Sequence, residues 1–262
     1  MQNSNIDHGK PFDFGKTSED YAKYRDIYPD GLYKTLLDAG VGLRGQKILD
    51  LGTGTGVLPR AMAKFGASFT GIDIAANQIE QAIALSHGDE IEFRCAAAED
   101  CGFAADTFDA ATACQCLTYF DHPKLAPLLA DILKVGGLFA VAYMAWLPDE
   151  DPIADASERL ILHYNPDWSG CCEKRHLIDI PKAYDDYFCV QSETLFDADI
   201  PFSRDSWNGR IKSCRGVGAA LSANDLAKFD REHRQLLEKI APPSFTIKHY
   251  VAVTVLKNRK LG

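Results

Sequence analysis

The sequence lacks several features that would point to nucleic-acid or membrane partners. Its 28 lysine and arginine residues are outnumbered by 37 aspartate and glutamate residues, and the net charge is -9. Nucleic-acid-binding proteins gain most of their affinity by neutralising phosphates with a basic face, so we expect no nucleic-acid partner. The longest apolar run, residues 135–147, is shorter than a bilayer-spanning helix requires, and we expect no membrane partner.

Cysteine pairs at metal-ligand spacing are also missing. None of the eight cysteines belongs to a Cys-x-x-Cys pair, so we predict no metal site and interpret the thiols as structural. A secretory signal is not found at the N-terminus either, which favours a reducing, cytoplasmic location. The sequence leaves the oligomeric state open.

The chain does contain an alternating pattern of apolar runs and helical segments. With 262 residues, 46% of them hydrophobic, it can bury a large core. The alternation, between residues 47 and 143, is typical of a parallel sheet with crossover helices. The predicted strands are Lys47–Leu51, Ser68–Asp73, Ile91–Cys95, Phe108–Cys114 and Gly137–Tyr143, with two later ones near Tyr187–Leu195 and His249–Leu256. The predicted helices include Leu32–Ala39, Val57–Phe65 and Pro123–Lys134, the last with Asp121 as its N-cap.

A glycine-rich turn follows the first predicted strand. The strand reaches Asp50, the turn reads Gly52-Thr53-Gly54-Thr55-Gly56, and a helix pattern begins directly after it. Glycines allow positive φ and let a ligand lie against the main chain. The free N–H groups of the helix N-terminus can bind a carboxylate or phosphate. The pattern indicates a ligand-binding turn, although a tight turn without a ligand is the alternative.

Two classes of ligand fit such a turn. Dinucleotide-binding folds use Gly-x-Gly-x-x-Gly, but the third glycine would fall at Val57, and no lysine follows for a phosphate-binding P-loop. The carboxylate of Asp50 would repel a pyrophosphate but suits an ammonium group. Asp73 ends the next strand, where it can accept hydrogen bonds from ribose hydroxyls. The combination favours S-adenosylmethionine over NAD.

These features resemble motif I and the following acidic strand end of class I S-adenosylmethionine-dependent methyltransferases, in the small-molecule branch often called methyltransferase type 11. The resemblance covers roughly residues 14–145. It continues through Ala98–Phe103, Asp106–Ala110, Thr112–Asp121 and Leu133–Leu138, and Tyr21–Arg25 with Tyr28–Pro29 is similar to the family's N-terminal flap. It implies an α/β fold, a doubly wound Rossmann-like seven-stranded sheet that is mostly parallel with an antiparallel last strand, plus helical lid insertions.

The resemblance implies S-adenosyl-L-methionine as cofactor and S-adenosyl-L-homocysteine as product. Asp50 and the glycine turn would hold the methionine portion, and Asp73 the ribose. Around the adenine the family pattern places Ile74, Gln78, Ala98 and Glu99, with Gln115 below the sulfonium. The implied cofactor-binding residues are Tyr21, Arg25, Asp50, Gly52, Thr53, Gly54, Thr55, Gly56, Asp73, Ile74, Gln78, Ala98, Glu99 and Gln115.

Two departures from related patterns bear on function. Many relatives have an aspartate at the position of Ala97, where it accepts from the adenine amino group, and alanine cannot do so. Glu99, Asp100 or a backbone carbonyl would have to substitute. The Asn/Asp-Pro-Pro-Tyr motif of nucleic-acid amino methylases is absent at Gln115–Thr118, which disfavours methylation of a base.

Domain boundaries follow from the loss of alternation after Pro148. We divide the chain into residues 1–148, which form the flap and cofactor-binding core, 149–187, a lid insertion, 188–200, a core strand, 201–240, a second lid segment, and 241–262, the last core strand. Lids of this kind admit a substrate and then exclude water.

Methyl transfer is an in-line displacement that needs a base only for acceptors such as hydroxyls. The candidate catalytic residues are Tyr119, His122 and His163. For Tyr119 an aromatic wall is the alternative, for His122 a helix cap or surface position, and for His163 a packed ring. The candidate substrate-binding residues are Tyr28, Tyr143, Trp146, Trp207, Arg210 and Arg215. The arginines suggest an anionic small-molecule acceptor, with solvated surface arginines as the alternative.

The sequence therefore predicts methyl transfer from S-adenosylmethionine to a small molecule. A non-catalytic protein that binds S-adenosylmethionine or S-adenosylhomocysteine is one alternative, and an NAD-dependent oxidoreductase is the other.

Overall fold

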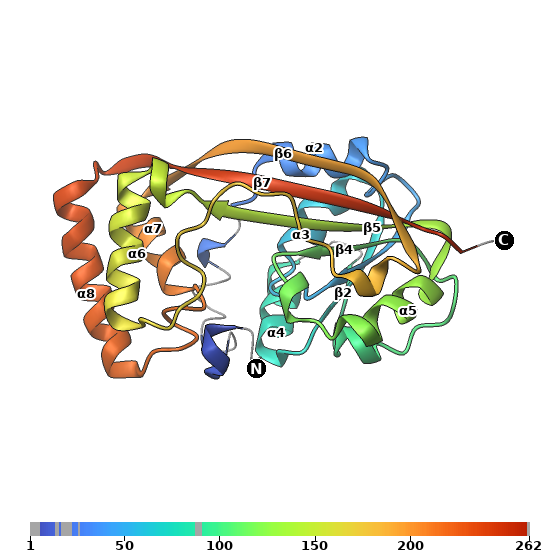
Figure 1. Cartoon of the computed structure of the whole chain (residues 1–262), viewed down its shortest axis with the longest axis horizontal. Coiled ribbons are helices and arrows are strands. Elements are labelled where there is room, and N and C mark those ends of the chain that lie inside the picture. Colours follow the sequence, from blue (N-terminus) through green and yellow to red (C-terminus); the bar gives the residue numbers. More distant parts are fainter. Residues whose placement is uncertain (1–5, 14–15, 17–22, 26, 87–90, 261–262) are drawn as a thin grey trace. The chain divides into compact units, whose positions relative to one another are not determined.

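The computed structural model describes residues 6–13, 16, 23–25, 27–86 and 91–260 (Figure 1). The α-helices are α2 (Asp30–Asp38), α3 (Val57–Met62), α4 (Ala76–Leu85), α5 (His122–Ile132), α6 (Pro152–Tyr164), α7 (Arg204–Lys212) and α8 (Ala223–Ile240). The strands are β1 (Lys47–Leu51), β2 (Ser68–Asp73), β3 (Ile91–Cys95), β4 (Phe108–Cys114), β5 (Leu133–Trp146), β6 (Phe188–Ser203) and β7 (Ser244–Asn258). None of these helices is both long and apolar enough to cross a bilayer.

The seven strands form one sheet in the order β3-β2-β1-β4-β5-β7-β6. Strands β1 to β5 pair in parallel, and β7 runs in the opposite direction to its neighbours (Figure 1). The predicted fold, a doubly wound Rossmann-like sheet with an antiparallel last strand, is confirmed. In a sheet of this kind ligands bind beyond the carboxyl ends of the parallel strands, where the order reverses.

Strands β1 to β4 have the predicted bounds, but the predictions for the other three were too short. Strand β5 begins at Leu133, and its register against β4 shifts before Leu138, which marks an irregularity around Gly136. Strand β6 continues to Ser203 because its inward side chains alternate with exposed acids such as Asp197 and Asp199. A search for continuous apolar runs misses such a half-buried edge strand.

The predicted helices exist within two residues of their expected starts. The helix from Val57 ends as a 3₁₀ turn, η3 (Ala63–Phe65), and Gly66 follows with a φ of 97°. Asp121 is at the N-cap position of α5, as expected from the sequence. Its side chain, however, makes no capping hydrogen bond, and its carboxylate pairs with Lys124 at 2.7 Å.

The chain divides into two compact units, which we name by their content. The sheet unit comprises Pro29–Met144, His176–Phe196 and Val251–Gly262, and the helical unit comprises Met1–Tyr28, Ala145–Arg175 and Asp197–Tyr250. Strands β5, β6 and β7 contribute residues to both. The lid boundaries expected from the sequence, 149–187 and 201–240, differ from these limits, and their role as a lid stays a prediction.

Each unit buries its own core. In the sheet unit, Leu49 and Leu51 of β1, Phe139 and Val141 of β5 and Leu129 of α5 belong to one buried cluster. In the helical unit, α8 packs against α6 and α7. There the ring centroids of Trp146 and Trp207 lie 5.5 Å apart, and those of Phe202 and Trp207 lie 4.9 Å apart. The apolar burial of such large aromatic side chains stabilises a small helical unit strongly.

Candidate cofactor and acceptor sites

The glycine turn between β1 and α3 has the backbone that its sequence predicts. Gly52, Gly54 and Gly56 have φ values of 59°, 55° and 74°, in the left-handed region that favours glycine. A Cβ on Gly52 would lie 2.9 Å from the Cβ of Cys116, and one on Gly56 would lie 2.7 Å from the Phe93 ring. Conformation and close packing therefore both require glycine here.

Asp73 lies at the carboxyl end of β2, beside this turn. One carboxylate oxygen accepts from the backbone N–H of Gly54 at 3.0 Å, and the other accepts from that of Ala75 at 2.9 Å. Burial raises the pKa of Asp73, although the backbone hydrogen bonds oppose that rise. Since a carboxylate has about four acceptor positions, both oxygens can still accept a hydroxyl.

Asp50 is buried below the turn, with 2% of its surface exposed. Thr112, its register partner on β4, donates its hydroxyl to the Asp50 carboxylate at 2.5 Å. Burial raises the pKa of Asp50 to about 6, even though the Thr112 bond lowers it. Asp50 is therefore tied to β4, and its direct contact with an ammonium group stays a prediction.

The residues expected around the adenine follow β2 and β3. Ile74 is half exposed, at 51%, although it is a large apolar side chain, whereas Gln78 and Ala98 are buried. Glu99 lies in the 3₁₀ turn η4 (Ala98–Asp100), and its Oε1 accepts from the backbone N–H of Asp121 at 2.7 Å. An exposed isoleucine beside buried polar groups suits the face of a flat, partly polar ring.

Gln115 follows β4 with a φ of 66°, a backbone conformation that non-glycine residues rarely adopt. Its backbone N–H donates to the carbonyl of Ala142 at 2.9 Å, and its side-chain Nε2 donates to the carbonyl of Met144 at 2.5 Å. Both bonds go to β5. They fix the side chain at the carboxyl end of the sheet, where strained residues often belong to functional sites.

Of the catalytic candidates, His122 and Tyr119 lie after β4 in the sheet unit. Tyr119 ends the 3₁₀ turn η5 (Leu117–Tyr119) and packs partly buried against the core. His122 Nδ1 lies 3.2 Å from the hydroxyl of Tyr184, which is almost fully buried. Burial lowers the pKa of His122, so its ring is neutral at pH 7. If the buried Tyr184 hydroxyl donates to Nδ1, the proton of His122 sits on Nε2, which favours a packing role.

The remaining candidates divide between the two units. Tyr21 lies outside the described residues. Arg25 donates through Nε to the hydroxyl of Ser213 at 3.2 Å.

His163 is exposed on α6, with its ring 5.4 Å from that of Tyr164. Tyr28 is half-buried in the helical unit, and Tyr143 is half-buried on β5, where its ring centroid lies 5.9 Å from that of His176. Their proposed roles stay predictions.

Three of the expected acceptor-binding residues form part of the buried core of the helical unit. The indole N–H of Trp146 donates to Glu158 at 2.6 Å, and that of Trp207 donates to the Ser157 hydroxyl at 2.9 Å. The guanidinium of Arg210 lies 5.0 Å from the centre of the Trp146 ring and is 4% exposed. A cation over an indole face is attracted by the ring electrons.

Arg215 has a different partner from the one expected. Its Nε lies 2.8 Å from the Asp7 carboxylate, and Asp7 also accepts from the backbone N–H of Ser169 at 2.8 Å. Only 4% of the Asp7 side chain and 15% of the Arg215 side chain are exposed. The alternative that Arg210 and Arg215 are solvated surface residues was therefore wrong, and Arg215 is held in a buried ion pair.

Reasoning from the sequence missed a polar chain inside the helical unit. Ser157, Asn208 and His233 are fully buried; the two ring nitrogens of His233 lie 3.0 Å from the Ser157 hydroxyl and 2.8 Å from the Asn208 side-chain oxygen. The arrangement resembles a nucleophile–histidine pair, but the Ser157 hydroxyl donates to the carbonyl of Ile153 at 2.8 Å. This hydrogen-bonded network is fully buried and out of reach of a substrate, so its role is structural. No local sequence pattern links residues so far apart.

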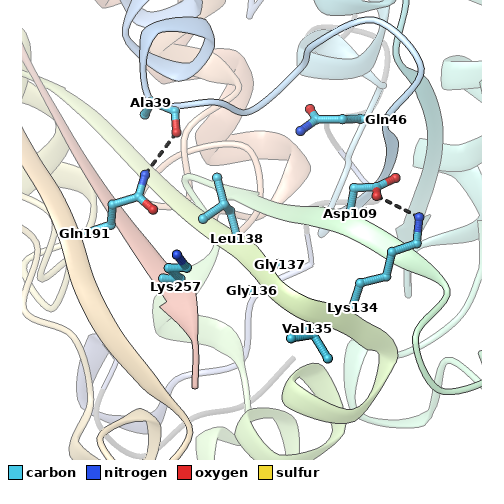
Figure 2. Close-up of a pocket in the computed structure, with 10 residues that line it drawn as sticks. All are labelled: Ala39, Gln46, Asp109, Lys134, Val135, Gly136, Gly137, Leu138, Gln191 and Lys257. Atoms are coloured by element: carbon cyan, nitrogen blue, oxygen red, sulfur yellow. Dashed lines mark hydrogen bonds and ion pairs between the residues drawn. The ribbon is translucent and has the colours of Figure 1, made fainter. Parts of the chain in front are cut away.

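A cavity of about 430 Å³ lies elsewhere in the sheet unit (Figure 2). Gln46, Asp109 and Lys134 line it near the amino ends of β1, β4 and β5, and Lys257 lines it near the carboxyl end of the antiparallel β7. Lys134 pairs with Asp109 at 2.7 Å (Figure 2). This open, polar hollow is therefore at the opposite end of the strands from Asp50 and the glycine turn, and we do not assign the cofactor to it. The described residues include no group of three or more His, Cys, Asp or Glu side chains placed to hold a metal.

Comparison with known proteins adds a domain assignment. Residues 49–141 match the family model described as a methyltransferase domain. The ubiquinone biosynthesis O-methyltransferase of Chromobacterium violaceum is 36% identical over 107 residues, which are 38% of this chain and 45% of that protein. The protein of the same name from Neisseria meningitidis is 30% identical over 147 residues, 51% of this chain and 61% of that protein. The chain thus spans about half the length of these curated relatives.

Solved structures share the fold over more of the chain. One from Anaeromyxobacter dehalogenans, assigned as a type II methyltransferase, has a TM-score of 0.59 at 21% identity and covers 89% of this chain and 97% of that chain. One from Bacillus halodurans, assigned as a methyltransferase, has a TM-score of 0.54 at 16% identity and covers 87% of this chain and 99% of that chain. At these identities the likeness shows the fold alone.

Proposed function

We propose that this chain, which carries a methyltransferase domain at residues 49–141, transfers the methyl group of S-adenosylmethionine to a small-molecule acceptor. The observation that carries the proposal is the arrangement of Asp73 beside the glycine turn. Its carboxylate, held by the N–H groups of Gly54 and Ala75, keeps acceptor capacity beside the glycine turn. A ribose with two neighbouring hydroxyls is the ligand that such a carboxylate suits.

The residues present fit the cofactor in three respects. The left-handed Gly52, Gly54 and Gly56 form the tight turn beside which the methionine portion would lie. The exposed face of Ile74 suits an adenine ring, and the carboxylate of Asp73 suits the ribose. These residues do not favour a pyrophosphate, because the charged group at the end of the strand before the turn is the carboxylate of Asp50, which would repel the phosphates.

The cofactor, when bound, supplies an electrophilic methyl group on a sulfonium. The protein then has to bind and orient the cofactor and the acceptor and to keep water out. Positioning the two reacting partners provides much of the rate of such displacements. Asp73 and the glycine turn would bind the cofactor. Gln115, tied to the carbonyls of Ala142 and Met144, would hold the edge of the site that faces the methyl group.

The acceptor is a small molecule, and two features narrow its class. The curated relatives are named as O-methyltransferases, so a hydroxyl is the first acceptor group to test. A hydroxyl acceptor needs a base; His122 is neutral at pH 7, but its Nδ1 is engaged with the Tyr184 hydroxyl at 3.2 Å. Arg215 is paired with Asp7, so that side chain does not favour an anionic acceptor.

One observation favours the second candidate, a protein that binds the cofactor without turnover. Ala97 has no side-chain acceptor for the adenine amino group, its carbonyl accepts from the N–H of Asp100 at 3.2 Å, and Glu99 accepts from Asp121. The adenine contact therefore has to come from the remaining acceptor positions of these groups.

Calorimetric titration with S-adenosylmethionine, S-adenosylhomocysteine and NAD tests the first step. We expect the first two to bind and NAD not to bind; tighter binding of NAD would overturn the assignment. Release of S-adenosylhomocysteine against a panel of hydroxyl, amine and carboxylate acceptors then separates the enzyme from the non-catalytic binder. Binding without release against every acceptor supports the binder.

A further inference from the structure

Two adjacent cysteines lie in a tight turn of the helical unit, between α6 and the boundary at Arg175. Cys171 is half-buried, and Cys172 is exposed. The turn is closed by the Trp168 indole, because a Cβ on Gly170 would lie 2.7 Å from the indole nitrogen. The thiol of Cys171 also donates to the carbonyl of Trp168 at 3.6 Å.

The two thiols lie within reach of each other. Burial first, and then the neighbouring Cys172 thiol, raise the pKa of Cys171 to about 11. Cys172 has a φ of 59°, so its backbone is in a conformation that a non-glycine residue rarely adopts. Backbone strain at such a position marks a place where a small covalent change can alter the local fold.

We propose that Cys171 and Cys172 are a thiol-pair modification site, which closes to a disulfide between neighbouring residues when it meets a small-molecule disulfide such as oxidised glutathione. The exposed Cys172 thiol gives up its proton and attacks the small disulfide, and the small thiolate that leaves takes up that proton, so one small thiol is released. The Cys171 sulfur then attacks the Cys172 sulfur, its proton goes to the departing small thiolate, and a second small thiol leaves. One small disulfide is reduced, and the two protein thiols are oxidised.

Geometry makes this bond a reversible one. Neighbouring Cα atoms lie about 3.8 Å apart across a trans peptide bond, which is closer than the roughly 4.4–6.8 Å that ordinary disulfides span. A disulfide closed over that separation is strained and therefore more easily reduced than a structural disulfide. The pair is suited to respond to the thiol–disulfide balance, and it is poorly suited to hold the fold together.

A hydrogen-bonded path links the pair to the aromatic core. The backbone N–H of Cys172 donates to one oxygen of Glu158 at 2.9 Å, and the indole N–H of Trp146 donates to the other at 2.6 Å. Glu158 is 3% exposed, so it has little water to replace a lost donor. Closing the disulfide has to turn the peptide bond between the cysteines, which moves the N–H of Cys172. Glu158 then transmits the change to Trp146, beside Arg210.

Peptide mapping after oxidation tests the site. The full chain is incubated with oxidised glutathione, alkylated and digested with trypsin; residues 160–174 form one tryptic peptide that contains both cysteines and no others. We expect this peptide to lose two hydrogens, to resist alkylation and to recover with dithiothreitol. Exposed Cys189, in its own peptide, is the internal control and should carry glutathione at most. A 160–174 peptide with free thiols or with bound glutathione overturns the proposal.

Tryptophan fluorescence tests the path. Oxidation should shift the emission of the parent, and the shift should be lost in Cys172→Ser and reduced in Glu158→Gln, whose single amide oxygen cannot serve both donors. Cys189→Ser should behave like the parent. Disulfide closure without any emission shift would contradict the link through Glu158, and an unchanged shift in Glu158→Gln would do the same.

Discussion

The carboxylate of Asp73 accepts a hydrogen bond from the backbone N–H of Gly54, with 3.0 Å between the nitrogen and the oxygen. This bond ties the end of β2 to the turn that follows β1, and a second one from Ala75 fixes the other oxygen at 2.9 Å. The same side chain therefore shapes the turn and presents the remaining acceptor positions for a ribose. A substitution there should affect both properties.

We expect Asp73→Ala to weaken S-adenosylmethionine binding by about 1.5–3 kcal/mol, the usual cost of losing hydrogen bonds to a charged group. Asp73→Asn should lose less, because the amide oxygen still accepts. Titration calorimetry measures both, with the exposed Glu80→Gln on α4 as a control for charge. An affinity of Asp73→Ala within twofold of the parent would remove Asp73 from the ribose site.

Two glycine substitutions separate backbone strain from close packing. Gly45 and Gly52 both have positive φ, 84° and 59°, but a Cβ on Gly45 meets nothing within 4 Å, whereas one on Gly52 lies 2.9 Å from Cys116. Gly45→Ala should cost about 1–2 kcal/mol of unfolding free energy from strain alone. Gly52→Ala should cost about 1–3 kcal/mol more from overpacking and should also weaken cofactor binding. Urea unfolding measures the loss of unfolding free energy, and calorimetry measures the loss of cofactor affinity. Equal losses of unfolding free energy in the two variants would contradict the packing argument.

The buried ion pair of Asp7 and Arg215 predicts a stability effect where the sequence suggested an acceptor contact. Arg215→Met leaves the Asp7 carboxylate buried without its cation, and such losses cost about 3–5 kcal/mol. Asp7→Asn in the same chain should restore much of the loss, because the amide needs no counter-charge. The measurement is a double-mutant cycle by urea unfolding. Additive effects of the two substitutions would show that the pair does not interact.

Two buried histidines should each contribute a loss of stability as the pH falls below about 6.5. Burial lowers the pKa of His233 to about 4 and that of His249 to about 3, both below the ordinary value of 6.5. Between those values the unfolded chain binds protons that the folded chain does not. Each histidine therefore removes about 1.4 kcal/mol of stability per pH unit as the pH falls from 6.5 toward its folded pKa, and none above 6.5.

The variant His233→Gln isolates this effect. Its unfolding free energy at pH 7 should be lower than that of the parent, because a buried hydrogen-bonded group is lost, but it should depend less on pH between 6.5 and about 4.5. The exposed His163→Gln on α6 is the matched control and should keep the slope of the parent. An unchanged slope in His233→Gln would show that His233 takes up its proton in the folded chain.

We expect Ala97→Asp to raise the affinity for S-adenosylmethionine. Ala97 precedes η4 in an extended conformation that accommodates an N-cap aspartate, and the new carboxylate can accept from the adenine amino group. A net hydrogen bond of about 0.5–1.5 kcal/mol corresponds to affinity about two- to tenfold tighter. Calorimetry with S-adenosylmethionine measures it, and Ala105→Asp at an exposed loop position controls for the added charge. Weaker binding would place the adenine elsewhere.

The parts of the fold that the sequence predicts well are those with local causes. The bounds of β1 to β4 follow from apolar runs that end at Asp50, Asp73 or a turn, and the left-handed glycines follow from the turn itself. Strand β6 was underestimated because only one of its faces is apolar. Its exposed Asp197 and Asp199 interrupt the apolar run, so this stretch resembles a loop in the sequence.

The parts that the sequence could not predict depend on residues that meet only after folding. Arg215 is 208 positions from Asp7 and reads as a free cation until that partner is known. Thr112 could have been found, because pairing β1 with β4 in register places it directly beside Asp50. The short distance from Trp168 to Cys171 is local, but the link through Glu158 to Trp146 is not.

The division into two units has a consequence for how the chain is made. Each unit draws on three separate stretches, and the sheet unit includes residues 251–262 while the helical unit includes residues 1–28. A ribosome that has released residues 1–148 has therefore supplied only part of either unit. Because domains generally fold as whole units, neither can reach its native state until synthesis has passed residue 250. Expression of either unit as an ordinary truncation should consequently yield insoluble chains.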